Sequence, residues 1–315
     1  FPAGGRTTIN GHQLVHGTAL HESETWRHQE SLGPTHIPSA LAMAGLRSVS
    51  LGLELVRSGG VSLRQTMKAL AATVDVLVCD VETDEDLRAI ADASLVLGRE
   101  TVWAGSAGLA YHLPLAANLS GEISDVEALT LVSGPTLIVI GSMSSVSREQ
   151  VDLLEEASHI GTIHLSPRVL LAGPKSPQWV EHARNIATML QSGRDTLVVL
   201  KAGELLDRNQ SRFLSSAIGS IMKPLAGVVG ALVASGGETA RAILDGWGIN
   251  SLRMMSEVEP GLPYAVAEGW SRSLPILTKA GAFGSPRSLL HCWEFLHALD
   301  RGTKARISRQ KDPDD

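Results

Sequence analysis

Residues 230–239 read GALVASGGET and place an apolar run directly before two glycines. The run Gly230–Ala234 is typical of a short buried strand, and Thr239–Gly246 has the apolar spacing of an amphipathic helix. Between them, Gly236 and Gly237 let backbone N–H groups approach an anion, and the positive end of the helix dipole favours negative charge. The turn Ser235–Thr239 therefore suits a phosphate. A tight turn that uses glycine only for its dihedral angles is the competing interpretation.

Two further loops have the same setting. Thr278–Gly284 (TKAGAFG) follows the apolar run Leu274–Leu277 and adds Lys279, either as a partner for an anion or as a solvated strand-end lysine. Ile140–Ser145 (IGSMSS) closes the apolar run Thr136–Gly141 with a hydroxyl-rich loop. Because the carboxyl ends of parallel strands meet at one edge of a sheet, the three loops together predict a nucleotide or phosphate site.

Strands alternate with helices along most of the chain, which indicates an α/β fold. We expect two domains, each with a mostly parallel sheet flanked by helices, because 315 residues exceed the ~100–200 of one domain. The polar stretch 118–135, rich in Gly, Ser and Pro, is the best linker candidate. The expected domains are therefore 1–125 and 133–300, followed by a charged tail over 301–315 that we expect to be disordered.

The apolar patterns also predict individual elements. In the first domain we expect strands at Ser48–Leu55, Val76–Asp80 and Thr101–Ala104, and helices at Ser62–Val74 and Thr83–Ala93. In the second we expect further strands at Thr162–Leu165 and Thr196–Leu200, and helices at Ser147–Ser158, Pro177–Gln191 and Asp207–Leu225.

The composition argues against several classes of protein. The formal net charge of −6 is spread without blocks, so neither nucleic acid nor an anionic membrane is an expected partner. Apolar runs such as Leu197–Leu200 are far shorter than the ~20 residues of a membrane helix. Cys79 and Cys292 lie far apart, so we expect no disulfide framework, and a reducing, cytoplasmic location.

Several familiar motifs are absent or incomplete. The chain contains no GxxxxGK[ST], GxGxxG or GxSxG sequence, which argues against a P-loop ATPase, a Rossmann dehydrogenase and an α/β-hydrolase. His12 and His16 have the i,i+4 spacing of a helical zinc site, but Gly11 disfavours a helix and Gln13 stands where HExxH needs Glu. We therefore assign no metal ligands and interpret both histidines as exposed polar residues.

Strings along the whole chain resemble the four-carbon acid sugar kinase family. ASGGETA (Ala234–Ala240), SEVEPGLP (Ser256–Pro263) and LTKAGAFG (Leu277–Gly284) are similar to that family's C-terminal nucleotide-binding domain. FPAGGRTT (Phe1–Thr8), VCDVETDEDL (Val78–Leu87) and WAGSAGLA (Trp103–Ala110) resemble its N-terminal sugar-acid-binding domain, and IGSMSSVSREQ (Ile140–Gln150) its inter-domain loop. The ordered occurrence of these strings is far more specific than any one of them.

The resemblance implies an ATP- and Mg²⁺-dependent kinase that phosphorylates the terminal 4-hydroxyl of threonate, erythronate or an oxo-tetronate. ATP and the sugar acid are then the small-molecule partners, and a homodimer is one option for the assembly. The resemblance assigns the nucleotide to Ser142, Ser144, Gly236, Gly237, Glu238, Thr239, Gly281 and Gly284, to which we add Lys279. It assigns the sugar acid to Arg6, Gly105 and Ser106.

The chain also departs from the family pattern. Ser147 stands where Thr is usual, Ser256 where the family often has Gly, and Ala282 where a second Gly is common. The family's leading strand and acidic Asp-Asp-x-Thr-Gly-type loop do not precede Phe1. We therefore expect an incomplete N-terminal part of the sugar-acid-binding domain.

The catalytic residue is accordingly left unassigned. We expect the 315 residues to bind nucleotide with little phosphoryl transfer, and Asp80 and Glu82 are the first candidates for a base if transfer occurs. A non-catalytic nucleotide- or sugar-acid-binding protein is the alternative function, and a plain structural α/β scaffold is the third reading.

Overall fold

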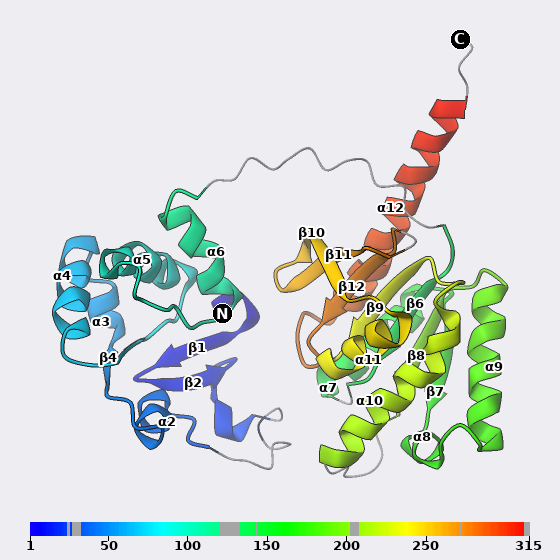
Figure 1. Cartoon of the computed structure of the whole chain (residues 1–315), viewed down its shortest axis with the longest axis horizontal. Coiled ribbons are helices and arrows are strands. Elements are labelled where there is room, and N and C mark those ends of the chain that lie inside the picture. The colour runs from blue at the N-terminus through cyan, green and yellow to red at the C-terminus, as the bar shows by residue number, and fades with distance from the viewer. Residues whose placement is uncertain are drawn as a thin grey trace. The chain divides into compact units, whose positions relative to one another are not determined.

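The computed structural model describes residues 1–23, 26, 33–119, 133–142, 144–201, 208–270 and 273–311, with side chains except at 208–212 and 300–311. The chain divides into an N-terminal unit, Phe1–Asp125, and a C-terminal unit, Val126–Asp315 (Figure 1). Residues 120–132, most of the expected linker, lie outside the described residues. Each unit has a hydrophobic core of its own.

A seven-stranded sheet forms the centre of the C-terminal unit. Its strands are β6 (Thr136–Ile140), β7 (Gly161–Leu165), β8 (Thr196–Leu200), β9 (Ala231–Ser235), β10 (Ser251–Glu259), β11 (Leu262–Glu268) and β12 (Pro275–Lys279). In space they follow the order β10-β11-β12-β9-β6-β8-β7. The strands from β12 to β7 are parallel, whereas β10 and β11 form an antiparallel hairpin at one edge. The sheet is therefore mostly parallel, as the sequence predicts.

Helices cover both faces of this sheet (Figure 1). They are α7 (Ser145–Ala157), α8 (Pro167–Ala172), α9 (Pro177–Gln191), α10 (Arg208–Met222), α11 (Gly237–Trp247) and α12 (Ser288–Lys311), with the 3₁₀ turn η4 (Lys223–Leu225). In β6, Leu137 and Val139 pack on the side of α8 to α11, and Ile138 and Ile140 on the side of α7 and α12. Burial on both faces explains why this strand is a continuous apolar run.

The strand order reverses at β6. From β6 the chain passes to β7 and β8 on one side, and it then crosses to β9 and β12 on the other. In an open parallel sheet, such a reversal leaves a crevice outside the carboxyl ends of the strands, because the following loops diverge to opposite faces. The loops after β6, β9 and β12 border this edge.

The N-terminal unit contains two small sheets instead of the expected mostly parallel one, so that expectation is wrong for this unit. Strands β1 (Arg6–Ile9), β2 (His12–Val15) and β3 (Thr18–Ala19) form an antiparallel sheet, and β4 (Ser48–Leu51) and β5 (Val76–Cys79) form a parallel pair. The β1–β2 turn consists of Asn10 and Gly11, with φ angles of 50° and 71°. Two positive φ angles are what a two-residue type I′ hairpin requires, and Asn-Gly supplies them.

Helices of the N-terminal unit pack around these sheets. They are α2 (Ile37–Met43), α3 (Leu53–Val56), α4 (Gly60–Ala71), α5 (Asp84–Ser94) and α6 (Ala107–Ala116), with 3₁₀ turns η1 (Pro2–Gly4), η2 (Leu20–Glu22) and η3 (Leu95–Leu97). Among the described residues of the whole chain, no helix is both long and apolar enough to span a membrane.

Three further sequence-based expectations differ from the structure. The run Ser48–Leu55, expected as one strand, is a strand only over Ser48–Leu51, because the chain turns at Gly52 into the helix α3. Thr101–Ala104 forms no strand. Val102 is 89% exposed there, and the Trp103 indole donates to Ser94 Oγ at 2.8 Å. The segment from Gly302 to Lys311, expected to be disordered, continues α12, and the last four residues lie outside the described chain. The last two errors concern segments in which neither the apolar nor the charged residues recur with a clear period.

Candidate nucleotide and sugar-acid sites

Three loops of the C-terminal unit border one cavity of about 240 Å³. They are the serine loop (Gly141–Ser145), the glycine turn (Ser235–Thr239) and the lysine loop (Lys279–Ser285). The cavity is lined by Gly141, Ser142, Leu200, Leu214, Ser215, Gly236, Gly237, Glu238, Thr239 and Gly281. The sequence indicates the three loops, but it carries no signal for the part that α10 contributes, because that helix reaches the cavity through long-range packing.

The glycine turn presents the start of α11 to the cavity. The N-cap residue Gly236 has a φ of 103°, which favours glycine, and it has no side chain to cap the helix. A Cβ on Gly237, the first residue of α11, would meet nothing within 4 Å. The buried hydroxyl of Ser235 lacks a hydrogen-bond partner among the described residues. The first N–H groups of α11 are therefore without a side-chain cap beside open space, which is a setting for an anion.

Glycine also allows the three loops to touch one another. A Cβ on Gly141 would overlap the Thr239 side chain, and a Cβ on Gly281 would overlap the side chain of Ser142. Larger residues at either position would push the loops apart and change the shape of the cavity.

The serine loop is held by its own hydroxyl groups. Ser144 is the N-cap of α7, and its Oγ accepts the backbone N–H of Ser147 at 3.2 Å. Ser142 Oγ donates to Ser144 Oγ at 3.2 Å. Ser147 Oγ donates to the Gly281 carbonyl at 2.7 Å and so links this loop to the lysine loop. Of the two serines that the sequence assigns to nucleotide binding, Ser142 lines the cavity and Ser144 caps the helix.

Lys279 is buried at the end of β12, with 3% of its surface exposed. Its Nζ donates to the carbonyls of Ala280, Gly281 and Phe283 at 3.0, 2.9 and 2.8 Å. Burial lowers the pKa of Lys279 to about 8, and the nearby groups Cys292 and Glu259 act in the opposite direction. The ammonium is therefore directed at the backbone of its own loop in this structure.

The Gln150 amide supports the same loop from α7. Its Nε2 donates to the carbonyls of Phe283 and Ser285 at 3.1 and 2.7 Å. Gly284, which the sequence assigns to the nucleotide, has a φ of 93° and packs on Ser288. Sequence reasoning assigns no role to Gln150, although a glutamine three residues after Ser147 on the buried face of α7 is a usable signal.

In the N-terminal unit, the structure places the segments of the predicted sugar-acid residues side by side. Arg6 begins β1, which is tied to the end of β5 by reciprocal Thr8–Val81 backbone bonds of 2.8 Å. Ser106, preceded by Gly105, is the N-cap of α6 and makes no side-chain cap bond. A Cβ on Gly108, in the first turn of α6, would lie 3.2 Å from the Phe1 ring. The Phe1–Arg6 segment and the start of α6 are therefore neighbours.

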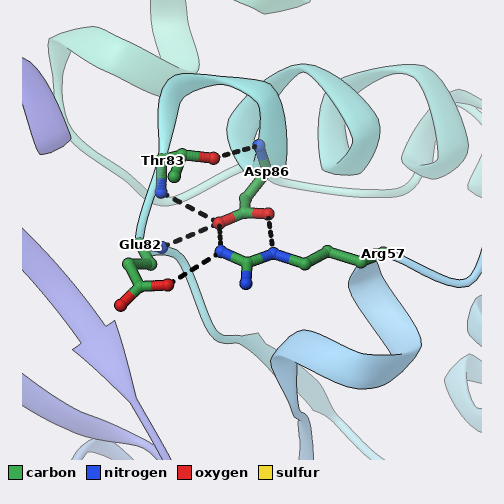
Figure 2. A network of polar contacts seen from close by, with 4 residues as sticks. All are labelled: Arg57, Glu82, Thr83 and Asp86. Atoms are coloured by element: carbon green, nitrogen blue, oxygen red, sulfur yellow. Dashed lines mark hydrogen bonds and ion pairs between the residues drawn. The ribbon is translucent and has the colours of Figure 1, made fainter.

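Two carboxylates of this unit have structural partners. Buried Asp80 accepts the backbone N–H groups of Asn10 and Gly11 at 2.6 and 2.9 Å, and so holds the β1–β2 turn. Glu82 Oε2 accepts a hydrogen bond from Arg57 Nη2 at 3.0 Å (Figure 2). Both sequence-based candidates for a base therefore have hydrogen-bond partners in this structure.

Asp86 organises the start of α5. Figure 2 shows its carboxylate paired with Arg57 through two bonds of 2.8 Å, while it also accepts the N–H groups of Glu82 and Thr83. Thr83 Oγ1 in turn accepts a hydrogen bond from the Asp86 N–H, which completes the capping box at the residue where the sequence predicts the helix to begin. The Arg57 hydrogen bonds hold the pKa of Asp86 well below its usual range, although burial opposes this shift.

The histidines near the N-terminus do not form the helical pair that a zinc motif requires. His12 lies in β2, and His16 follows the strand with a φ of 49°. Within the part of the chain that the structure describes, no three His, Cys, Asp or Glu side chains gather as metal ligands.

Family models match both units. The model described as a nucleotide-binding C-terminal domain matches residues 137–289. The model described as a sugar-binding N-terminal domain matches residues 1–113. The first range contains all three loops around the cavity, and the second contains Arg6, Gly105 and Ser106.

Solved structures share the fold. A crystal structure of a Salmonella typhimurium LT2 protein superposes with a TM-score of 0.71 at 20% identity, covering 93% of this chain and 71% of the other. A Haemophilus influenzae protein superposes with a TM-score of 0.60 at 19% identity, covering 96% and 72%. At these identities the likeness concerns the fold alone.

Curated relatives are kinases of four-carbon acids. The chain is 37% identical to a D-threonate kinase from Cupriavidus necator over 301 residues, which are 93% of this chain and 71% of that protein. It is 28% identical to a 3-oxo-tetronate kinase from Pseudomonas savastanoi (90% and 68% covered) and 23% identical to a D-erythronate kinase from Heliobacterium modesticaldum (94% and 71%). This similarity spans both units, and the chain therefore belongs to the four-carbon acid sugar kinase family.

Proposed function

We propose that the protein transfers the γ-phosphoryl group of ATP to the terminal 4-hydroxyl of a four-carbon acid sugar such as threonate, erythronate or an oxo-tetronate. The observation that carries this proposal is the cavity at the reversal of the strand order, lined by three glycine- and serine-containing loops. Phosphoryl transfer depends mainly on positioning and charge stabilisation, which such loops supply.

The nucleotide phosphates fit the glycine turn. The N–H groups of Gly237, Glu238 and Thr239 begin α11 without a side-chain cap, and Ser142 and Gly281 line the same cavity. At about 240 Å³ the cavity is smaller than the roughly 300–1,000 Å³ of most small-molecule sites, so it suits phosphate groups better than a whole nucleotide. Mg²⁺ in such sites is held largely by phosphate oxygens and water. It therefore needs no cluster of protein ligands, and the described residues form none.

For the sugar acid we propose Arg6 together with the start of α6. A guanidinium binds a carboxylate bidentately, and the N-terminus of α6 behind Gly105 and Ser106 favours negative charge. The contact between Gly108 and Phe1 keeps the two segments adjacent.

A direct test offers the protein ATP, Mg²⁺ and, separately, D-threonate, D-erythronate and 3-oxo-tetronate, with ADP release followed in a coupled assay. The proposal expects release that depends on at least one of these acids and not on glycerate, which is one carbon shorter. ADP release that no acid stimulates argues against the proposed acceptor.

A second candidate is a protein that binds nucleotide or sugar acid without catalysis. It is favoured by the engagement of Asp80 with the β1–β2 turn and of Glu82 with Arg57, which leaves both candidate bases occupied. Calorimetric binding of ADP and of D-threonate without any acid-dependent ADP release in the coupled assay would support this candidate.

A further inference from the structure

Three side chains donate short hydrogen bonds to carbonyl oxygens of the lysine loop, beside a longer one of 3.5 Å from Ser144 Oγ to the Gly281 carbonyl. Lys279 Nζ contacts the carbonyls of Ala280, Gly281 and Phe283, Ser147 Oγ contacts that of Gly281, and Gln150 Nε2 contacts those of Phe283 and Ser285. We call Lys279, Ser147 and Gln150 the carbonyl clamp. All six of these donor–acceptor distances lie between 2.7 and 3.1 Å, so the loop is held at four of its carbonyls between residues 280 and 285.

The clamp determines the direction of the peptide groups that it grips. The described peptide bonds are all trans, and in a trans peptide the N–H points opposite to the carbonyl. With the carbonyls of Ala280 and Gly281 turned toward the ammonium, the N–H groups of Gly281 and Ala282 point away from it. Gly281 is the residue of this loop that lines the cavity.

The charge of Lys279 lies behind the loop. Its ammonium is buried, and no carboxylate among the described residues lies within ion-pair distance of it. The titratable groups that face it are Glu259 of β10 and Cys292 of α12. A buried cation whose partners are carbonyl dipoles polarises those peptide groups and makes their N–H ends better donors to an anion.

We propose that Lys279 is a positioning residue of the nucleotide site: it binds the lysine loop instead of the anion and directs the N–H groups of Gly281 and Ala282 toward the phosphates. This role rests on the proposed function and differs from that of a strand-end lysine that contacts phosphate directly. Under direct contact, the losses from Lys279 and Ser147 would be independent, and their effects on nucleotide affinity would multiply.

The test compares ADP affinity by calorimetry in the variants Lys279→Met, Ser147→Ala and their combination. The expected losses are at least about tenfold for Lys279→Met, which removes charged donors, and several-fold for Ser147→Ala. Because both act on the Gly281 carbonyl, the double variant should lose less than the product of the single losses. Lys223→Met, at an exposed lysine before β9, is the charge-matched control and should retain wild-type affinity.

A pH series adds a measurement that a purely structural role would not affect. If the protonated form of Lys279 is the one that binds, the ADP affinity of the wild type should fall about tenfold from pH 7 to pH 9, while that of Lys279→Met stays nearly level. Melting temperatures without ligand show whether each variant is folded. If Lys279→Met fails to fold, Ser147→Ala and the wild-type pH series still decide.

The outcomes separate this inference from the proposed function. A wild type that does not bind ADP overturns the proposed nucleotide site itself. A wild type that binds ADP, with Ser147→Ala unchanged or with an affinity that is level from pH 7 to pH 9, overturns only the positioning role of Lys279.

Discussion

At the scale of single residues, Arg6 is the cation that we propose to bind the substrate carboxylate. Replacing Arg6 by Ala removes charged hydrogen bonds worth about 1.5–3 kcal/mol, so the affinity for D-threonate should fall about 10- to 100-fold. Calorimetry with D-threonate and with ADP measures both affinities, and the ADP affinity should not change. Arg99→Ala, at an exposed arginine of the same unit, should change neither. A parallel loss of both affinities in Arg6→Ala would point to damage of the fold.

Residue types predict the loops of this site better than they predict what each side chain does there. Glycines at Gly141, Gly236 and Gly281 mark turns and close approaches, and the structure shows both. The sequence shows a lysine at position 279, but it does not show whether the side chain reaches into solvent or folds back onto its own loop. The difference comes from the burial of β12 beneath α7 and α12, which is set by tertiary packing.

At the scale of elements, periodicity and caps predict much of the chain. The helix at Pro177–Gln191 and the strand at Thr196–Leu200 have the expected bounds. A proline marks the first residue of the helix, and a continuous run of buried apolar residues defines the strand. The β1–β2 hairpin is not among the predicted elements, although Asn10-Gly11 is a usable signal for it. The apolar residues of Thr101–Ala104 suggest a strand, but this segment pairs with no strand of the described chain.

The start of α5 gives a prediction about stability. Because Arg57 lowers the pKa of Asp86 in the folded protein, the ionised carboxylate stabilises the fold above its unfolded pKa of ~3.9. This contribution is lost as the pH falls below that value toward the folded pKa. We expect Asp86→Asn to lower the free energy of unfolding by about 1–3 kcal/mol at pH 7, with a difference from wild type that shrinks between about pH 5 and pH 2.

Urea denaturation followed by circular dichroism measures this difference. Asp92→Asn, on the exposed side of the same helix, is the matched control and should stay within about 0.5 kcal/mol of wild type. A difference between Asp86→Asn and wild type that is constant down to pH 2 would show that the ionised carboxylate is not the stabilising species.

At the scale of the whole molecule, the order of short sequence strings along both units predicts the family. The similarity to a D-threonate kinase over 93% of the chain confirms this prediction. No single string predicts the strand order that places three of these strings around one cavity. It follows from the crossing of the chain from one side of β6 to the other, a long-range feature of the sheet.

The central claim is that the loops after β6, β9 and β12 form a nucleotide site, and calorimetric titration with ADP and Mg²⁺ tests it most directly. Val in place of Gly237 would fill open space beside the uncapped start of α11, whereas Gly227 has equally open surroundings at the far end of β9. We predict one ADP per chain, an affinity at least about tenfold weaker in Gly237→Val, and an unchanged affinity in Gly227→Val. No ADP binding by the wild type, or equal binding by Gly237→Val, would contradict the claim.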